Sequence, residues 1–309
     1  MNVLSPDDID FGAYLKETEA KQRVRPAREY VNELCERLGK PVIHRGQSLP
    51  WAKASGYFRF RPGEVTLWAG VNGHGKSLMN GFVMLDLIAK KQKVCIASFE
   101  MKPHSTLERM LRQWTGYAPD FAENPSALDS MRDLYEQFND LTDQKLWFYD
   151  QQGTVSADQM IAVARYCAKE LGIKHIVIDS LMKCVRGADD YNGQKNFVDE
   201  LTSIARDYEV HIHLVHHIRK LENELKKPDK TDVKGAGEIT DMVDNVLLVW
   251  RNKADPIGRK ESEADAALIC CKQRHGEWEG GINLWFHKES QQFMEAPGLG
   301  FMDFARRVE

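Results

Sequence analysis

The sequence predicts an α/β fold, in which a mostly parallel sheet is flanked by helices and ends in antiparallel strands. From residue 63 onward, short β-rich runs alternate with amphipathic segments, a pattern typical of a parallel sheet covered on both faces. Between about 245 and 295 the β-rich runs follow one another directly, which predicts antiparallel hairpins. A glycine-rich motif between a strand run and a helical run indicates a phosphate site in this fold.

The composition is that of one large or two small folded domains. The chain has 309 residues, 42% of them hydrophobic, and a net charge of -4, which excludes a disordered or collagen-like protein. Its apolar runs are far shorter than the roughly 20 residues that span a bilayer, and no signal peptide follows Met1. Its six cysteines form no C-x-x-C pair, as is typical of reduced cytosolic thiols. We therefore expect a soluble protein of the cytoplasm, with no membrane partner and no structural metal.

The chain divides into an N-terminal arm, residues 1–47, and one domain, residues 48–309. The arm is densely charged, and its one strong pattern is helical, over 27–38. The apolar residues of this helix fall on one stripe, formed by Tyr30, Val31, Leu34, Cys35 and Leu38. Such a stripe must be buried against something, which could be a neighbouring subunit.

The elements of the domain follow from local patterns. A helix is expected to start near Lys76, and further helices fill the gaps between the early strands. The helix over 156–171 opens with a capping-box pair, Ser156 and Gln159, and continues with apolar residues along one face. The runs that predict strands cover residues 65–69, 94–99, 146–149, 175–178, 211–215, 245–250, 267–271 and 282–286.

Residues 70–77 match the phosphate-binding pattern Gly-x-x-x-x-Gly-Lys-Ser. Glycines let successive backbone N–H groups point at phosphates, and the following helix N-terminus adds a favourable dipole. Lys76 supplies a positive charge and Ser77 a ligand for Mg²⁺, whereas His74 is unusual and is interpreted as tolerated variation. The alternative is a tight glycine-rich turn without a ligand. The predicted nucleotide-binding residues of the loop are Gly70, Asn72, Gly73, His74, Gly75, Lys76 and Ser77.

Two acidic residues follow predicted strands at the sheet edge that carries the phosphate loop. Asp179 ends the apolar run 175–178 and is the predicted second ligand of Mg²⁺. Glu100 directly follows the run 94–99, so it could act as a general base on a water beside the γ-phosphate. Asp179 could instead cap the segment that follows it, and Glu100 could be a structural carboxylate.

Four histidines lie in or just after the strand run 211–215. His211 and His213 share one strand face, which raises the alternative of a metal site completed by His216 and His217. The strand offers no Cys, Asp or Glu beside them to complete a ligand set. We therefore expect His211 and His213 to be packed structural residues.

Three segments together resemble a known family. They are Arg-Pro-Gly-Glu-Val-Thr-Leu-Trp-Ala-Gly at 61–70, Ser-Phe-Glu-Met at 98–101 and Lys-Gln-Arg-His-Gly at 272–276. From about 49 to 295 the chain resembles the RecA-like P-loop motor domain of hexameric replicative DNA helicases. That family includes bacterial DnaB, the phage primase-helicases and mitochondrial Twinkle, and the phage and Twinkle branch is the most similar. The resemblance implies a RecA-like ATPase domain over 48–309 and an arm, 1–47, that serves as a linker helix docking on the neighbouring subunit. It also implies the cytoplasm of a bacterium or of a phage-infected host.

The resemblance also implies catalytic roles for residues outside the loop. Glu100 matches the family glutamate that polarises the attacking water. Lys272 and Arg274 match a Lys-x-Arg pair that reaches the nucleotide of the next subunit, with Arg274 as an arginine finger. His217, rather than His216, matches the residue that senses the γ-phosphate. The alternative for Lys272 and Arg274 is a pair of ordinary basic residues on an exposed hairpin.

The polar segment 219–241 is predicted to be a mobile, DNA-binding loop. It carries six Lys or Arg residues and four acidic residues over 219–234 and closes with Gly-Ala-Gly. In the family, the loop at this place lines the central channel and holds the backbone of single-stranded DNA. The alternative is a solvated loop with a modest local field. The resemblance implies DNA contacts for Arg219, Lys220, Lys234, Gly235 and Gly237, and contacts with the nucleobase for Arg251 and Phe286.

The leading functional hypothesis is a ring-forming, ATP-driven replicative DNA helicase that translocates on single-stranded DNA. It implies Mg²⁺ with ATP or another NTP or dNTP, a homo-oligomer that is expected to be a hexamer, and replication partners such as a primase, a polymerase or a loader. The arm has no zinc-ribbon pattern and no room for a primase fold, so we do not expect DNA priming by this chain. The alternatives are a recombinase-like ATPase that coats DNA and a regulatory ATPase that binds only proteins.

Overall fold

A computed structural model describes most of the predicted domain and little of the arm. The described residues are 2–5, 9–10, 12, 27, 31, 34–35, 38–39, 46–116, 127–187, 189–218, 223, 225–233, 237–254, 260 and 262–304. Within the arm, Val31, Leu34, Cys35 and Leu38 are helical and exposed, while Tyr30 lies outside the described residues.

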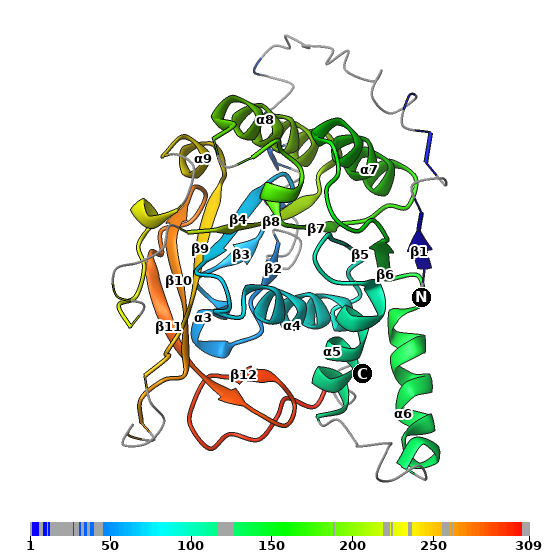
Figure 1. The fold of residues 1–309 in the computed structure, drawn as a ribbon, viewed down its shortest axis with the longest axis vertical. Helices are drawn as coiled ribbons and strands as arrows, with labels where there is room; N and C mark the ends of the chain where they lie inside the picture. Colours follow the sequence, from blue (N-terminus) through cyan, green and yellow to red (C-terminus); the bar gives the residue numbers. More distant parts are fainter. Residues whose placement is uncertain are drawn as a thin grey trace.

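One ten-stranded sheet crosses the described part of the chain in the order β1-β6-β5-β7-β8-β4-β9-β10-β11-β12 (Figure 1). Seven strands are joined by parallel pairing: β1 (Asn2–Leu4), β4 (Val65–Gly70), β5 (Val94–Ser98), β6 (Leu146–Tyr149), β7 (His175–Asp179), β8 (His211–His217) and β9 (Asn245–Arg251). Three more extend the sheet by antiparallel pairing: β10 (Ala266–Gln273), β11 (Gly280–His287) and β12 (Gln292–Met294). A separate ribbon joins β2 (Gln47–Ser48) to β3 (Arg59–Phe60).

Helices cover both faces of the sheet (Figure 1). One face carries α3 (Ala52–Ser55), α4 (Lys76–Ala89), α5 (Pro103–Thr115) and α6 (Ala127–Thr142), and the other carries α7 (Ala157–Lys169), α8 (Tyr191–Tyr208) and α9 (Gly237–Met242). The short 3-10 helices are η3 (Leu181–Lys183) and η4 (Lys230–Asp232). Since side chains alternate along a strand, Leu67 of β4 joins the core under α8, whereas Trp68 joins the core under α4. In the described part of the chain, no helix is long and apolar enough to cross a membrane.

The predicted α/β fold with antiparallel C-terminal strands is confirmed. Each predicted strand run is a strand whose ends differ from the prediction by at most two residues. The capping box of α7 is also confirmed, because Ser156 Oγ accepts the backbone N–H of Gln159 at 3.2 Å and Gln159 Oε1 accepts that of Ser156 at 3.3 Å. The sequence analysis missed β1, β2, β3, β12 and α3, which have two to four residues each and are too short to show a period. The prediction of a loop over 237–241 is wrong, because these residues belong to α9, a helix of six residues whose Ile239 is buried in the core.

Three histidines of β7 and β8 form a buried cluster against Phe60 of β3. His211 donates from Nδ1 to a backbone carbonyl at 2.7 Å, so its Nε2 accepts from the hydroxyl of Thr66 at 2.8 Å. Trp68 donates to Nδ1 of His213 at 3.2 Å, which leaves His213 Nε2–H to donate to Nδ1 of His175 at 3.1 Å. These bonds require neutral imidazoles, as predicted for packed structural residues.

The buried cluster makes the stability of the domain depend on pH. Burial lowers the pKa of His175 and His213 well below its usual value and lowers the pKa of His211 to about 4. Below about pH 6.5 these histidines therefore bind protons in the unfolded chain but stay neutral in the folded chain. The free energy of unfolding falls as the pH drops from about 6.5 to 4, by about 3 kcal/mol from His211 alone.

We therefore expect the urea midpoint to fall between pH 7 and pH 5, and His211→Gln to flatten that dependence. His104→Gln, at an exposed position on α5, is the matched control and should keep the natural dependence. An unchanged pH dependence in His211→Gln would contradict this assignment.

Candidate functional site

The phosphate loop follows β4 and is shaped by its glycines. Gly73 and Gly75 have φ angles of 76° and 83°, in the left-handed region that L side chains rarely adopt, and Gly75 is the residue before α4. At Gly70 the constraint is space, because a Cβ atom there would lie 2.5 Å from the carbonyl oxygen of Val249 on β9. The loop is therefore pressed against the neighbouring strand where it leaves β4.

Lys76 lies at the start of α4 with its ammonium group folded into the loop. Its Nζ atom donates to the carbonyls of Gly70 at 2.9 Å and Val71 at 3.1 Å, and the side chain is almost fully buried. Burial lowers the pKa of Lys76, while the carboxylates of Asp179 and Glu100 oppose that shift. Both acidic residues predicted from the sequence are therefore close enough to stabilise the charge of Lys76.

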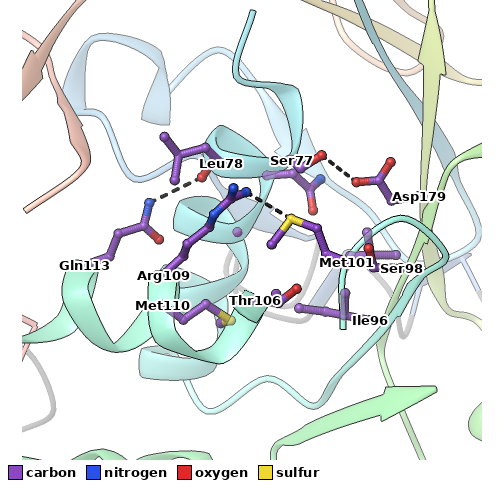
Figure 2. A pocket seen from close by; sticks show the side chains of 13 residues that line it. Ser77, Leu78, Ile96, Ser98, Met101, Thr106, Arg109, Met110, Gln113 and Asp179 are labelled. Atoms are coloured by element: carbon purple, nitrogen blue, oxygen red, sulfur yellow. Dashed lines mark hydrogen bonds between the residues drawn. The ribbon is translucent and has the colours of Figure 1, made fainter. Parts of the chain in front are cut away.

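Ser77 and Asp179, the two predicted metal ligands, point toward one another (Figure 2). The hydroxyl of Ser77 donates to Oδ2 of Asp179 at 2.5 Å. Burial raises the pKa of Asp179, while the Ser77 hydroxyl and the Lys76 ammonium lower it. A hydroxyl and a carboxylate oxygen in contact are hard oxygen donors that suit Mg²⁺, so the residues present fit this ion.

Glu100 emerges beside this pair at the same sheet edge. Ser98 of β5 stands opposite Asp179 of β7, and the backbone N–H of Phe99 donates to the Asp179 carbonyl at 3.0 Å. The side chain of Glu100 is about half exposed, and the Nζ atom of Lys183 lies 4.0 Å from its Oε1 atom. The carboxylate is thus open to a ligand placed over the loop, and Lys183, which the sequence analysis did not single out, stands beside it.

His217 ends β8 directly beside the start of the loop. In the parallel register of β4 and β8 it stands opposite Gly70, and the next residue, Ile218, donates its N–H to the Gly70 carbonyl at 3.3 Å. His217 is half-buried, whereas His216 is completely buried. The structure therefore places His217, rather than His216, where a group above the loop could reach it.

The other side of the loop is bounded by β9, β11 and β12. The backbone N–H of Arg251, at the end of β9, donates to Nδ1 of His74 at 3.1 Å. The rings of Phe286 and Phe293 lie 5.3 Å apart, and Phe293 also lies beside Gly75. Arg251 and Phe286 thus lie on one wall next to the loop, as nucleobase contacts would require.

Lys272 and Arg274 lie at the opposite edge of the sheet from the loop. Lys272 of β10 pairs with Val246 near the start of β9. Asp244, just before β9, accepts the N–H of Val65 at the start of β4 at 2.9 Å and forms an ion pair with Arg274, with 3.1 Å between Oδ1 and Nε. Since the loop follows the end of β4, the two basic residues cannot reach the phosphate site of their own chain.

Both basic side chains cap the C-terminal end of α9. Lys272 Nζ donates to the carbonyls of Thr240, Asp241 and Val243 at 2.8 Å each. Arg274 Nη2 donates to the carbonyls of Asp241 and Met242 at 3.0 and 3.2 Å. The last carbonyls of a helix have no partner within it, so the two cations satisfy their hydrogen-bonding capacity. The positive charges also interact favourably with the negative end of the helix dipole.

The predicted DNA-binding loop is only partly described. Arg219, Lys220, Lys234 and Gly235 lie outside the described residues, and Gly237 is the first residue of α9. The loop therefore leaves β8 beside His217 and returns through α9 to the edge that carries Lys272 and Arg274.

A small cavity of about 30 Å³ lies behind Ser77 and Asp179, between α4 and α5 (Figure 2). Its walls include Asn80, whose amide nitrogen has no hydrogen-bond partner among the described residues, and Arg109, which donates to the sulfur of Met101 at 3.0 Å. The sequence analysis missed both residues, since neither belongs to a local motif.

The comparisons with known proteins agree with this arrangement. Residues 55–295 match the family model of the DnaB-like helicase C-terminal domain. The chain belongs to the DnaB-like helicase C-terminal domain family. The match covers the phosphate loop, both acidic residues and the Lys272 and Arg274 pair of this DnaB-like domain, which confirms the resemblance seen in the sequence.

Solved structures share the fold of the DnaB-like domain. One is an ATPase domain, and it superposes with a TM-score of 0.74 at 16% identity, over 87% of this chain and 98% of that one. Another, a DnaB-like replicative helicase described with its interactions with primase, superposes with a TM-score of 0.68 at 18% identity. That superposition covers 87% of this chain and 65% of the other, so the chain spans less than two thirds of that helicase.

The close approach of Gly70 to β9 predicts a cost for any side chain there. Gly70→Ala would place its Cβ atom against a backbone oxygen that cannot rotate away, so we expect it to destabilise the domain by about 1–3 kcal/mol. Gly81→Ala, inside α4 with no neighbouring atom within 4 Å of the new Cβ, is the control and should stabilise by up to about 1 kcal/mol. Urea unfolding of both variants measures this, and equal midpoints would contradict it.

Proposed function

We propose that the domain is the motor of a ring-forming, ATP-dependent replicative DNA helicase that translocates on single-stranded DNA. One observation supports this most strongly: the phosphate loop and the Lys272 and Arg274 pair lie on opposite edges of one sheet. The six residues of β4 separate these edges by roughly 16 Å, given about 3.3 Å per residue. A complete site then needs a second copy whose Lys272 edge faces the loop, a head-to-tail contact that closes into a ring.

The chemistry of the loop edge fits hydrolysis of ATP or of another NTP or dNTP. The backbone N–H groups of the loop and Lys76 would bind the phosphates. Mg²⁺, held by Ser77 and Asp179, would neutralise phosphate charge when bound. Glu100 would accept a proton from the attacking water, and His217 would respond to the γ-phosphate beside Gly70.

The opposite edge would complete the nucleotide site of the neighbouring subunit. Arg274 and Lys272 would add positive charge where the γ-phosphoryl group develops negative charge, which makes hydrolysis depend on assembly. Both side chains are bound to α9 in the single chain, so moving them toward a neighbour's nucleotide disturbs the helix that ends the DNA-binding loop. ATP hydrolysis at one subunit interface would thereby change the structure of α9 and of the DNA-binding loop that precedes it.

The remaining assignments extend this proposal. Arg219, Lys220, Lys234, Gly235 and Gly237 would bind the DNA backbone. The arm would dock Val31, Leu34 and Leu38 on a neighbouring subunit, since these side chains are 51–58% exposed in the single chain. A hexamer is the expected ring, and a primase, a polymerase or a loader would be its replication partners in the cytoplasm.

Mixing two inactive variants tests the split site. Lys76→Ala removes a phosphate contact, and Arg274→Ala removes the proposed finger, so each variant alone should lose most ATP hydrolysis. Subunits of the two variants, mixed before assembly, would form about one quarter of their contacts with both groups intact and should regain a similar share of the basal rate. Arg206→Ala, at an exposed arginine on α8, is the control and should keep full activity.

Full ATP hydrolysis by Arg274→Ala alone would contradict the split site and favour a regulatory ATPase. If both variants are inactive, a mixture that regains no hydrolysis would also contradict the split site. Adding single-stranded DNA distinguishes the alternatives further. A DNA motor should be stimulated by DNA in a salt-sensitive way and should separate a forked duplex, whereas a recombinase-like coat would bind DNA without separating strands.

A further inference from the structure

His74 is the one unusual residue of the phosphate loop, and the structure gives it a specific contact. Its side chain is only 1% exposed, although it belongs to a loop at the edge of the sheet. The backbone N–H of Arg251 donates to its Nδ1 atom at 3.1 Å, across 177 residues of sequence. The interpretation of His74 as tolerated variation, made from the sequence, is therefore incomplete.

The contact joins the two parts of the proposed nucleotide site. His74 lies between Gly73 and Gly75, among the loop residues that would surround the phosphates. Arg251 is the last residue of β9 and belongs to the wall that would receive the nucleobase. Because Nδ1 accepts a hydrogen bond, the imidazole carries its proton on Nε2, so a defined neutral form makes the link.

The aromatic part of the same wall also lies near the loop. A Cβ atom on Gly75 would lie 3.7 Å from the ring of Phe293, and that ring lies 5.3 Å from the ring of Phe286. The Phe293 ring makes no directional bond with the loop, whereas the hydrogen bond from Arg251 N–H to His74 Nδ1 depends on both distance and angle. His74 therefore carries the directional part of the connection.

We infer that His74 is a positioning residue that sets the separation between the phosphate loop and the wall formed by Arg251 and Phe286. This inference rests on the proposed nucleotide site. It states that His74 affects the binding of the base and sugar rather than that of the phosphates. His74 acts through the backbone of Arg251, so its effect falls on ligands that span the loop and the wall. Ligands that have phosphates but no base or sugar need only the loop.

The test compares Mg-ATP with Mg-tripolyphosphate, by calorimetry, on the natural chain and on three variants. His74→Leu removes the acceptor, and we expect it to raise the Kd for ATP about 10-fold while the Kd for tripolyphosphate stays within about twofold. His74→Asn places its Oδ1 atom near the position of Nδ1 and should restore ATP binding to within about threefold. His74→Gln is equally polar but carries its acceptor one bond further out, so it should behave like His74→Leu.

Parallel losses for both ligands in His74→Leu and His74→Gln would overturn the inference, because His74 would then shape only the loop. Unchanged ATP binding in these variants would overturn it as well. If His74→Leu does not fold, as its urea midpoint reveals, the Gln and Asn pair decides. If the natural chain binds tripolyphosphate as tightly as ATP, or binds neither, the nucleotide site itself fails and the inference fails with it, which separates this outcome from the others.

Discussion

The buried ammonium group of Lys76 is the interaction on which the rest of the site depends. A buried cation is costly unless hydrogen bonds and opposite charges surround it. Two carbonyls at the end of β4 accept its hydrogen bonds, and the carboxylates of Asp179 and Glu100 favour its charge. These groups follow β4, β7 and β5, so a parallel sheet with these strands near its centre is the arrangement that brings them together.

The same sheet separates two sets of candidate functional groups. The residues proposed to bind phosphate and Mg²⁺ and to act as the base lie at the edge where the parallel strands end, because crossover helices return the chain to the far edge each time. The antiparallel strand β10 runs back, and its end lies with Lys272 and Arg274 at the edge where β4 begins. The segment from His217 through α9 joins the two edges, and in the proposed ring it would link the nucleotide of one subunit to the basic pair that serves the next.

Local patterns in the sequence predicted most of the fold and the sheet edge at which Ser77, Asp179 and Glu100 lie together. The motif 70–77 begins at the last residue of β4, Asp179 is the last residue of β7, and Glu100 lies two residues after β5, so strand direction places all three at one edge. The contacts of His74, Lys272 and Arg274 could not be predicted in this way. They depend on the pairing of β9 with distant elements and on an irregularity between Cys270 and Lys272, which shifts the register that local periodicity would give. The strands β1 and β12 escaped prediction because three residues carry no period.

The most direct measurement of the split site is the rate of ATP hydrolysis per chain as a function of protein concentration, with sedimentation recorded on the same samples. If each site needs residues from two chains, the rate per chain rises with concentration and levels off where the sedimenting species becomes a closed ring. A rate per chain that stays constant into the range where the protein sediments as single chains would show that one chain holds a complete site, and would contradict the assembly-dependent motor.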